Sequence, residues 1–553
     1  MATSPDTTTT AGAAGSAATH TAVTGAPLPV EKQDARRVEL TRAEASHKLG
    51  FSWSASKKWT ILTVIFVVQC SMNFNAAVYS NTVDALASAP SDPSQGFGVS
   101  KQTARLGQCV FLLAYAFGCE LWAPWSEEIG RWPVLQLSLF FVNVWQILCA
   151  CAPNFASVAV GRALGGLSSA GGSVTLGMIA DMWKPEDQQF AVAYVVLSSV
   201  GGSVLGPIFG GLIQQYLPWR WNFWIQLIFG VVTQVIHFFV VPETRETCIM
   251  DKEAKRLRKS GERPDVYGPN EIKGSLFQRM TLRELVTIWV RPFHMFLTEP
   301  IVLCLSLLSG FSDALIFTFL DGFSPVFKQW GFTTITEGVA FASIMVGYVI
   351  AYVSFLPFFV RDRRHMAKSA TGNMAPERRL YWLLWTAPLE AIGLFGFAWC
   401  SLGPSHGIHW FAPLFFASLV GIANVSPHPL VSTIYALTHA YQYAIYMATI
   451  DYMVAAYGPY AASATGGNGF SRDFLAGIAA LYSTPFYNHF KTNTLELPST
   501  VLACIAVVVT VPIYVFYWYG PAIRERSPFA CTIAKKRAKD DDGDEQHEEV
   551  AAV

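Results

Sequence analysis

Apolar stretches long enough to cross a lipid bilayer recur along this chain between about residue 60 and residue 519. A helix needs about 20 apolar residues to cross the hydrocarbon core. Because backbone groups inside a bilayer must find partners within the chain, each such span must be helical. The sequence therefore predicts an all-α membrane protein with twelve transmembrane helices, at about 60–80, 103–123, 133–152, 157–182, 190–216, 221–241, 301–322, 337–360, 380–400, 411–457 (interrupted), 461–486 and 498–519.

The composition excludes several classes of function. Hydrophobic residues make up 52% of the chain and charged residues only 14%, against about 25% charged in typical soluble domains. The formal net charge is zero, so we expect no nucleic-acid partner. The ten cysteines form no CxxC or Cys/His ligand pattern, so we expect no metal site and no cofactor. The chain also lacks GxSxG, HExxH and phosphate-loop motifs, and we expect no enzyme activity.

Basic residues indicate how the spans are oriented. An even number of spans leaves both termini on one side of the membrane. Lys57 and Lys58 precede the first span, and the loop 242–300 between the sixth and seventh spans carries eleven basic residues. Because loops rich in lysine and arginine stay in the cytoplasm, we expect both termini there. The plasma membrane is the default location for such a protein.

The same charged loop divides the chain into parts. Residues 57–241 and 301–519 hold six spans each, and we expect two six-helix bundles joined by a cytoplasmic linker at 242–300. A parallel repeat of this kind places a substrate path between its halves. Residues 1–56 are rich in Thr, Ala and Ser, and residues 520–553 are charged, so we expect disordered cytoplasmic tails.

Small residues line one face of the fifth span. Gly202, Gly206 and Gly210 recur every four residues and therefore share a helix face, beside Pro207 and Gly211. Without side chains there, a neighbouring helix can approach backbone to backbone. Two interpretations stay open: a static packing seam, or a seam that takes part in a conformational switch.

A short motif lies between the second and third spans. Glu127, Gly130 and Arg131 follow the order acid-x-x-Gly-Arg. One acid, one glycine for the turn and one arginine can join two helix ends by charge and hydrogen bonds. The alternative is an ordinary charged loop.

Charged residues occur inside the predicted spans, where they are costly and therefore indicate function. Arg162 lies in span four, in an RxxGG sequence, and could instead extend to the membrane surface. Asp313 and Glu390 lie near mid-membrane with no adjacent cation in the sequence. Arg472 and Asp473 are neighbours in span eleven, and two interpretations stay open: a local structural pair, or side chains that each meet another helix, since adjacent residues point about 100° apart. These five residues are candidates for proton coupling; the alternative for Asp313 is a helix–helix hydrogen bond.

Two neutral side chains complete the candidate residues. Asn73 and Asn75 lie in span one, which holds no carboxylate before Asp84. Both are hydrogen-bonding residues, and we expect them to line the substrate path.

Taken together, these motifs resemble a known family of membrane proteins. From about residue 57 to 530 the chain resembles the fungal twelve-span drug:proton antiporters of the major facilitator superfamily. The string GxxxGPxxGG resembles the fifth-helix motif of exporters in that superfamily, the acid-x-x-Gly-Arg loop resembles its loop 2–3 signature, and RxxGG resembles a span-four motif implicated in proton coupling. Glu127 stands where an aspartate is usual in that signature. Glu128 and Trp132 replace positions that are usually basic, so we expect a weaker loop contact or one with other partners.

The resemblance implies a fold and a function. The fold is the major facilitator fold, with two six-helix bundles and alternating access to one central cavity. The function is proton-driven export by a monomer of a small organic compound: a secondary metabolite such as a glycolipid, organic acid or toxin, or a xenobiotic drug. Two alternatives remain: a proton-coupled importer of a small solute, and a membrane receptor or scaffold that transports nothing.

The tenth span contains an unusual insertion. Val425–Gln442 separates two half-length apolar segments and holds Pro427 and Pro429, which remove backbone donors at mid-membrane. Joining Asn424 to Tyr443 restores one continuous span. The segment has 18 residues, or 54 nucleotides, so its removal keeps the reading frame. Its first and last codons also permit splice-donor and splice-acceptor sequences, so we interpret it as a translated intron.

Transcript sequencing across this junction tests the intron hypothesis. We expect mature message that lacks the 54 nucleotides of 425–442. Uniform retention of all of them would contradict the hypothesis. The alternative would then hold: a re-entrant loop that lines the cavity, with His428 and His439 as titratable groups.

Overall fold

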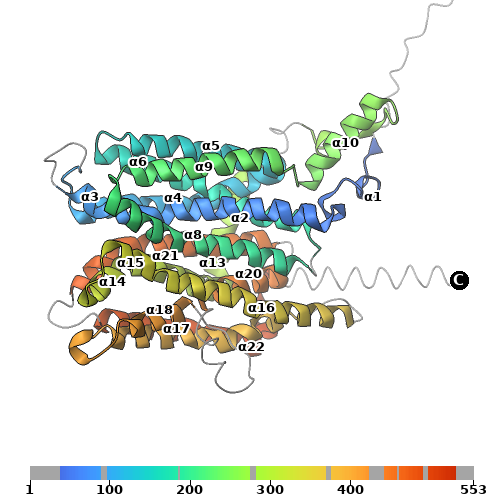
Figure 1. Ribbon diagram of the computed structural model, residues 1–553. Helices are drawn as coiled ribbons and strands as arrows, with labels where there is room; N and C mark the ends of the chain where they lie inside the picture. Colours follow the sequence, from blue (N-terminus) through green and yellow to red (C-terminus); the bar gives the residue numbers. More distant parts are fainter. Residues whose placement is uncertain are drawn as a thin grey trace, which may run out of the picture.

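The structure is a computed structural model that describes residues 38–88, 96–184, 187–274, 282–368, 375–421, 441–457, 460–489 and 496–530. Within these ranges it is a bundle of long helices (Figure 1). The tenth-span segment 425–442 falls almost entirely outside the described residues, as do 1–37 and 531–553. The intron and re-entrant-loop interpretations therefore both stay predictions.

The helices follow the predicted order. In the first half they are α2 (Ala55–Val78), α3 (Val83–Ala87), α4 (Lys101–Glu128), α5 (Arg131–Ala150), α6 (Phe155–Ser169), α7 (Val174–Met182), α8 (Gln188–Tyr216) and α9 (Trp221–Val240). In the second half they are α14 (Pro300–Phe327), α15 (Thr334–Ala340), α16 (Ala342–Lys368), α17 (Tyr381–Cys400), α18 (Phe411–Gly421), α20 (Tyr441–Tyr457), α21 (Ala461–His489) and α22 (Glu496–Arg526).

Several helix starts are explained by capping side chains. Ser54, Ser100 and Asn154 precede α2, α4 and α6. Each side-chain oxygen accepts a hydrogen bond from a backbone N–H of the first turn, which otherwise has no partner inside the helix.

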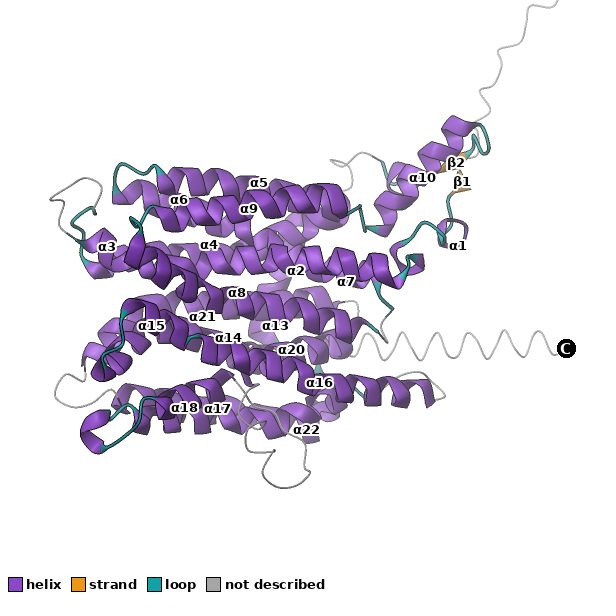
Figure 2. Cartoon of the chain, viewed as in Figure 1, coloured by secondary structure: helices purple, strands orange, loops and turns teal. Residues whose placement is uncertain are grey.

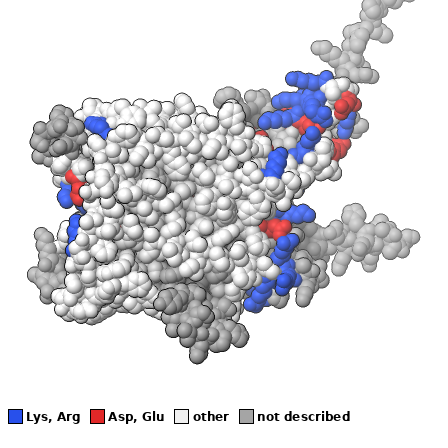
Figure 3. All heavy atoms as spheres, in the orientation of Figure 1, with Lys and Arg blue, Asp and Glu red and all other residues white. Residues whose placement is uncertain are grey.

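The outer wall of the bundle suits a bilayer. Among the described residues, nine helices are long and apolar enough to cross a membrane, by length and composition. The remaining three predicted spans are the α15–α16 pair, the interrupted α18 and α20, and α21, which carries the Arg472–Asp473 pair. Figure 3 shows charged side chains gathered at the two ends of the molecule and an uncharged wall between them. The prediction of an all-α membrane protein is confirmed.

The helices form two groups, one from each half of the chain (Figure 1). In the first, α2 packs on α8, α4 on α6, and α5 on α6 and α9; in the second, α14 packs on α21, and α17 on α18 and α22. The groups meet where α4 contacts α21 and where α8 contacts α15 and α16. A possible path through the molecule therefore lies between α2, α4 and α8 on one side and α14 and α21 on the other.

Part of the N-terminal region is ordered, contrary to the sequence-based expectation of a disordered tail up to residue 56. Residues 38–52 form β1 (Val38–Glu39), α1 (Arg42–Ala45) and a 3₁₀ turn. β1 pairs in parallel with β2 (Val266–Tyr267) of the linker (Figure 2). Arg42 Nε lies 2.9 Å from Glu246 Oε1, and Arg263 Nη1 lies 2.6 Å from Glu44 Oε1. Tertiary partners far along the chain, which composition does not reveal, order this segment.

The linker is also helical. It contains α10 (Glu246–Ser260), α11 (Pro269–Ile272) and α13 (Leu282–Thr298). The ring of Phe293 on α13 packs against Phe117 of α4 and Phe470 of α21, with centroids 6.1 Å and 4.8 Å away. α13 therefore packs against both halves of the bundle. We call the end of the bundle near α10 the linker end and the opposite end the far end.

The glycine face of α8 lies directly against α2. A Cβ atom placed on Gly206 would lie 2.6 Å from Ala77 Cβ, closer than real Cβ atoms approach. A Cβ on Gly202 would lie 2.5 Å from the Cys70 carbonyl oxygen of α2, and one on Gly210 would lie 2.5 Å from Oδ1 of the Asn81 side chain in the turn after α2. Gly202 and Gly206, which meet α2 itself, are therefore required for the helix–helix contact.

The opposite side of the motif meets the second half. A Cβ on Gly211 would lie 2.9 Å from the Thr334 carbonyl oxygen of α15. A Cβ on Gly338 of α15 would lie 2.7 Å from the Pro207 carbonyl oxygen of α8. Pro207 has no backbone N–H, so α8 lacks one hydrogen-bond donor at this point. The far end of α8 is therefore held between α2 of its own half and α15 of the other.

We predict that Gly206→Val leaves membrane targeting largely intact and stops export, because the valine occupies the seam between α8 and α2. The matched control is Gly201→Ala on the same helix, whose Cβ would meet only the flexible Met345 side chain, at 3.4 Å. Surface expression and the cellular and medium metabolites are measured together for both variants. Normal efflux at normal expression of Gly206→Val would contradict a functional seam.

Candidate functional site

A small cavity lies between the two halves. Its volume is about 20 Å³, roughly the space that one ordered water needs. Helices α2, α4 and α8 contribute from the first half, and α14, α20 and α21 from the second. Its polar lining residues are Asn73, Tyr115, Ser199, Ser203, Ser309, Asp313, Tyr446, Arg472 and Asp473.

Three charged side chains meet at this cavity. Arg472 Nη2 lies 3.4 Å from Asp473 Oδ2, and Arg472 Nε lies 4.0 Å from Asp313 Oδ2. The guanidinium also lies over the Tyr446 ring, 4.4 Å from its centroid. All three charged groups are mostly shielded from solvent. We call Asp313, Arg472 and Asp473 the central charge cluster.

The cluster combines the two interpretations of the Arg472–Asp473 neighbours. Asp313 has no cation near it in the sequence, yet α21 places Arg472 beside it across 159 positions of chain. Arg472 pairs with its neighbour Asp473 and also reaches Asp313 of another helix, α14. Adjacent residues on a helix point about 100° apart. The arginine side chain is long enough to reach the Asp473 carboxylate despite this difference in direction.

Arg162 lies away from this cavity. It is 1% exposed, inside the first bundle. Its Nη1 donates to the Asn75 carbonyl oxygen at 3.0 Å and to Asn75 Oδ1 at 2.9 Å. Its guanidinium lies over the rings of Phe111 and Tyr79, 3.9 Å and 4.7 Å from their centroids. The surface-extending alternative for Arg162 is therefore wrong: neutral oxygens and aromatic faces, instead of water, surround this cation.

The two asparagines of span one have different positions. Asn73 lines the cavity, with its Nδ2 donating to the Gln69 carbonyl oxygen at 3.0 Å. Asn75 is fully buried within the first bundle, where Gln146 Nε2 donates to its Oδ1 at 2.9 Å. Two residues along a helix point about 200° apart, so one span cannot aim both into the same path.

Glu390 is separate from the cavity as well. It is fully buried on α17, and Ser312 Oγ of α14 donates to its Oε1 at 2.6 Å. This contact lies inside the second bundle, and Glu390 is not among the residues that line the cavity. The structure thus brings together Asp313, Arg472, Asp473 and Asn73 of the predicted candidates, and separates Arg162, Asn75 and Glu390 from them.

Cross-half contacts join the two halves at the far end. Arg105 Nε of α4 lies 3.3 Å from Asp321 Oδ2 of α14, and Ser483 Oγ of α21 donates to the same oxygen at 2.6 Å. Gln102 Nε2 donates to the Leu481 carbonyl oxygen at 2.8 Å. Arg105 and Asp321 were not among the candidate residues predicted from the sequence. Both are charged residues inside predicted spans, and this position could have identified them.

Other cross-half contacts join them at the linker end. Gln189 Nε2 of α8 donates to Asp451 Oδ2 of α20 at 2.8 Å, and Arg379 pairs with the same carboxylate. The rings of Phe190 and Phe359 pack with centroids 5.4 Å apart. Side-chain contacts thus join the two halves on either side of the central charge cluster.

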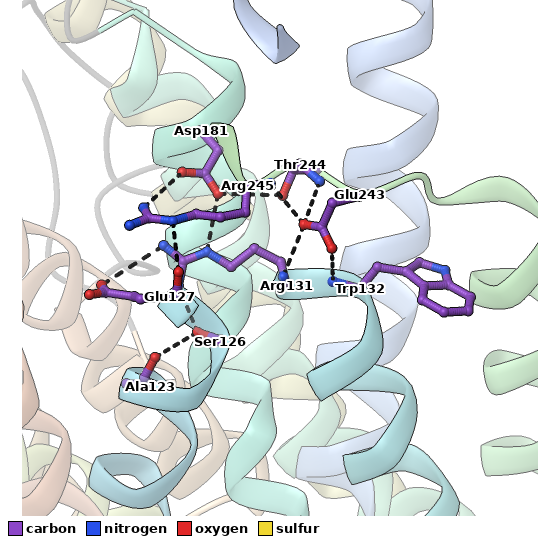
Figure 4. Close-up of polar contacts among 9 residues, drawn as sticks. All are labelled: Ala123, Ser126, Glu127, Arg131, Trp132, Asp181, Glu243, Thr244 and Arg245. Carbon is purple, nitrogen blue, oxygen red and sulfur yellow. Dashed lines mark hydrogen bonds and ion pairs between the residues drawn. The ribbon is translucent and has the colours of Figure 1, made fainter. Parts of the chain in front are cut away.

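The acid-x-x-Gly-Arg motif is part of a larger network at the linker end (Figure 4). Arg131 Nε lies 3.1 Å from Asp181 Oδ2 at the end of α7, and Arg131 Nη1 donates to Ser126 Oγ at 2.7 Å. Glu127 is farther away, with its Oε1 3.9 Å from Arg131 Nη2, and is half exposed. The main acidic partner of Arg131 is therefore Asp181, which lies 50 residues along the chain.

The exit of the sixth span completes this network. Glu243 Oε1 accepts a hydrogen bond from the Arg131 backbone N–H at 3.0 Å, and Glu243 Oε2 accepts one from the Trp132 N–H at 3.3 Å. Gly130, at φ 117°, leaves room for this carboxylate beside its backbone. A carboxylate at the first N–H groups of α5 is favoured by the helix dipole. The motif thus joins spans two, three, four and six.

Comparison with known proteins identifies similar sequences. The model of the Major Facilitator Superfamily matches residues 61–459. The efflux pump atB of Aspergillus terreus is 32% identical over 416 residues, covering 74% of this chain and 81% of that protein. The MFS-type transporter kojT of Aspergillus oryzae is 28% identical over 483 residues, covering 86% and 79%. A multidrug transporter of Candida glabrata is 27% identical over 490 residues, covering 87% and 77%.

Solved structures show the same fold. The proton:xylose symporter XylE, bound to 6-bromo-6-deoxy-D-glucose, aligns with a TM-score of 0.52 at 16% identity. The alignment covers 84% of this chain and 97% of that one. At this identity the likeness shows the architecture alone.

The network at the linker end generates a stability prediction. Asp181→Asn leaves the buried Arg131 without its closest carboxylate, and breaking a buried ion pair costs about 3–5 kcal/mol. We therefore expect a clear fall in Tm in detergent. Glu127→Gln is the matched control, since exposed pairs contribute about 0–1 kcal/mol. Equal changes in Tm for the two variants would show that Asp181 is not the main partner.

Proposed function

This chain belongs to the major facilitator superfamily, and we propose that it exports a small organic compound in exchange for protons. It is a membrane transporter and not an enzyme. The observation that carries the proposal is the central charge cluster, which lies between two halves that side-chain contacts join on either side of it.

The charges of the cluster suit proton exchange. Asp313 and Asp473 share the single guanidinium of Arg472, so the ionised cluster has a net charge of −1. Binding one proton makes it neutral, and a neutral cluster is less costly to enclose in a dry cavity than a charged one. We propose that protonation favours the form in which the halves are joined and that loss of the proton frees the halves to open.

Asp313 is our candidate for the carboxyl that exchanges this proton. Its distance to the arginine is the longer of the two, and it lines the cavity from α14 while both other members belong to α21. Arg162 and Glu390 are placed elsewhere in the molecule and are secondary candidates.

The lining of the cavity indicates the class of cargo. Asn73, Ser199, Ser203 and Ser309 offer neutral hydrogen-bonding groups, and Tyr115 and Tyr446 add aromatic faces. At about 20 Å³ the cavity holds no cargo in this form; we propose that it widens when the halves open, and that the same side chains then suit a small organic molecule with several polar groups. Relatives named as an efflux pump and a multidrug transporter support export, so we propose a secondary metabolite or a xenobiotic drug as cargo.

We further propose that the linker end faces the cytoplasm. The basic residues of α10 and α16 gather there, and the loops richest in lysine and arginine stay on the cytoplasmic side (Figure 3). Both termini are then cytoplasmic, the membrane is the plasma membrane, and the transporting unit is the monomer.

The coupling proposal is tested in inside-out vesicles with an imposed pH gradient. The cargo is first identified as the compound that a deletion strain retains in its cells. We expect Asp313→Asn to abolish gradient-driven accumulation and to keep cargo binding, because the driving proton is lost and the cavity is not. Glu390→Gln tests the secondary candidate in the same assay, and we expect it to retain transport because Glu390 does not line the cavity. Wild-type gradient-driven transport by Asp313→Asn would place coupling elsewhere, with Asp473 as the next candidate.

A further inference from the structure

A second pocket opens at the linker end, outside the path between the halves. Its volume is about 580 Å³. The end of the ordered N-terminal segment, the start of α2, three residues between α7 and α8 (Trp183, Lys184 and Asp187), and the end of α16 form its walls. Neither the central charge cluster nor the Arg131 network lines it.

The pocket is basic at its rim. Lys58, Lys184 and Arg363 line it, and Asp187 is the single acid among its described lining residues. Arg363 Nη1 lies 3.3 Å from Asp187 Oδ1, so this acid is already paired. Lys58 Nζ donates to the Phe51 carbonyl oxygen at 2.8 Å, and the described lining holds three basic side chains against one acid. The rim therefore carries an excess of positive charge.

Indole rings form the wall between this rim and the bundle. Trp53, Trp59 and Trp183 all line the pocket, and the rings of Trp59 and Trp183 meet edge to face with centroids 6.1 Å apart. Tryptophan beside lysine and arginine is typical of the level of lipid headgroups. Trp59 is 40% exposed at the start of a membrane-spanning helix.

A row of aromatic side chains continues from the pocket along the bundle wall. The Tyr194 ring lies 5.7 Å from Trp59 and 4.7 Å from Phe66, centroid to centroid, and 6.4 Å from Tyr352 of the second half. These half-buried rings offer an apolar track that begins at the basic rim. Such a combination suits a molecule with an anionic head and a hydrocarbon chain.

We propose that this pocket binds the phosphate-bearing headgroup of an anionic membrane phospholipid, with an acyl chain along the aromatic row. Basic pockets between transmembrane helices bind such headgroups, with about 1 kcal/mol per nearby lysine or arginine. The lipid touches both halves, since Lys58 and Lys184 belong to the first and Arg363 to the second. A soluble phosphate compound carries the same anionic group but has no hydrocarbon chain to pack along the aromatic row.

The proposal is tested by native mass spectrometry of the full chain titrated with dioctanoyl phosphatidylserine. We expect this lipid to bind the wild type at least tenfold more tightly than dioctanoyl phosphatidylcholine. The double variant K58Q/K184Q should weaken its binding about 30-fold, which corresponds to about 2 kcal/mol at 25 °C. K184Q alone changes one exposed side chain without disturbing the fold and should weaken binding about fivefold.

The control is K252Q/K259Q, which removes two exposed lysines from α10 at the same end of the molecule. It makes the same change in net charge and should leave the Kd unaltered, while lipid-free Tm values report whether each variant is folded. Equal affinity of the wild type for the two lipids, or wild-type affinity in folded K184Q, would overturn the proposal. Displacement of the lipid by an equal concentration of inorganic phosphate would also overturn it, in favour of a soluble ligand.

Discussion

Close backbone contact along α8 joins the two halves of this structure. In a bilayer, apolar helices gain little from leaving lipid for one another, so association depends on close packing and on hydrogen bonds. α8 achieves this by lacking side chains where it meets α2 and the turn after it, at Gly202, Gly206 and Gly210, and where it meets α15, at Gly211. One helix thus contacts its own bundle and the other bundle over the same stretch. A change in the angle between the halves must alter the contact of α8 with α15, while the contact of α8 with α2 stays within the first half.

The buried charges fall into three environments that suit three roles. Asp313, Arg472 and Asp473 face a small cavity between the halves, where opening would bring water to them. Arg162 is enclosed by carbonyl oxygens and aromatic rings inside one bundle, which fixes the packing of α2, α4 and α6. Arg131 joins helix ends at the linker side. Each buried charge is costly in a membrane. We assign a transport role to the charges at the interface between the halves and a structural role to the charges within one half.

Local sequence patterns predicted much of this architecture, and long-range contacts explain the rest. The glycine face of α8 followed from a four-residue spacing, and Arg131 from a short motif, because both depend on neighbours within one or two turns. The partner of Arg131 is Asp181, and the partner of Asp313 is Arg472. The members of each pair are far apart in the sequence, so no local pattern predicts either contact. The order of residues 38–52 was missed for the same reason, since its β-strand partner lies in the linker. Glu390 satisfied the pattern of a coupling acid, but the rotation of α17 directs it to Ser312.

The central claim is that the two halves open alternately around the central charge cluster. Pulsed electron paramagnetic resonance measures this directly, in a background where serine replaces Cys151 and Cys504, which are exposed among the described residues, and Cys531, which lies outside them. One spin-label pair at Tyr216 and Val339 spans the far end, and another at Ser56 and Arg364 spans the linker end; all four positions are exposed. The account predicts that a change of pH or added cargo lengthens one distance while the other stays short. Simultaneous lengthening of both distances, or no change in either, would contradict it.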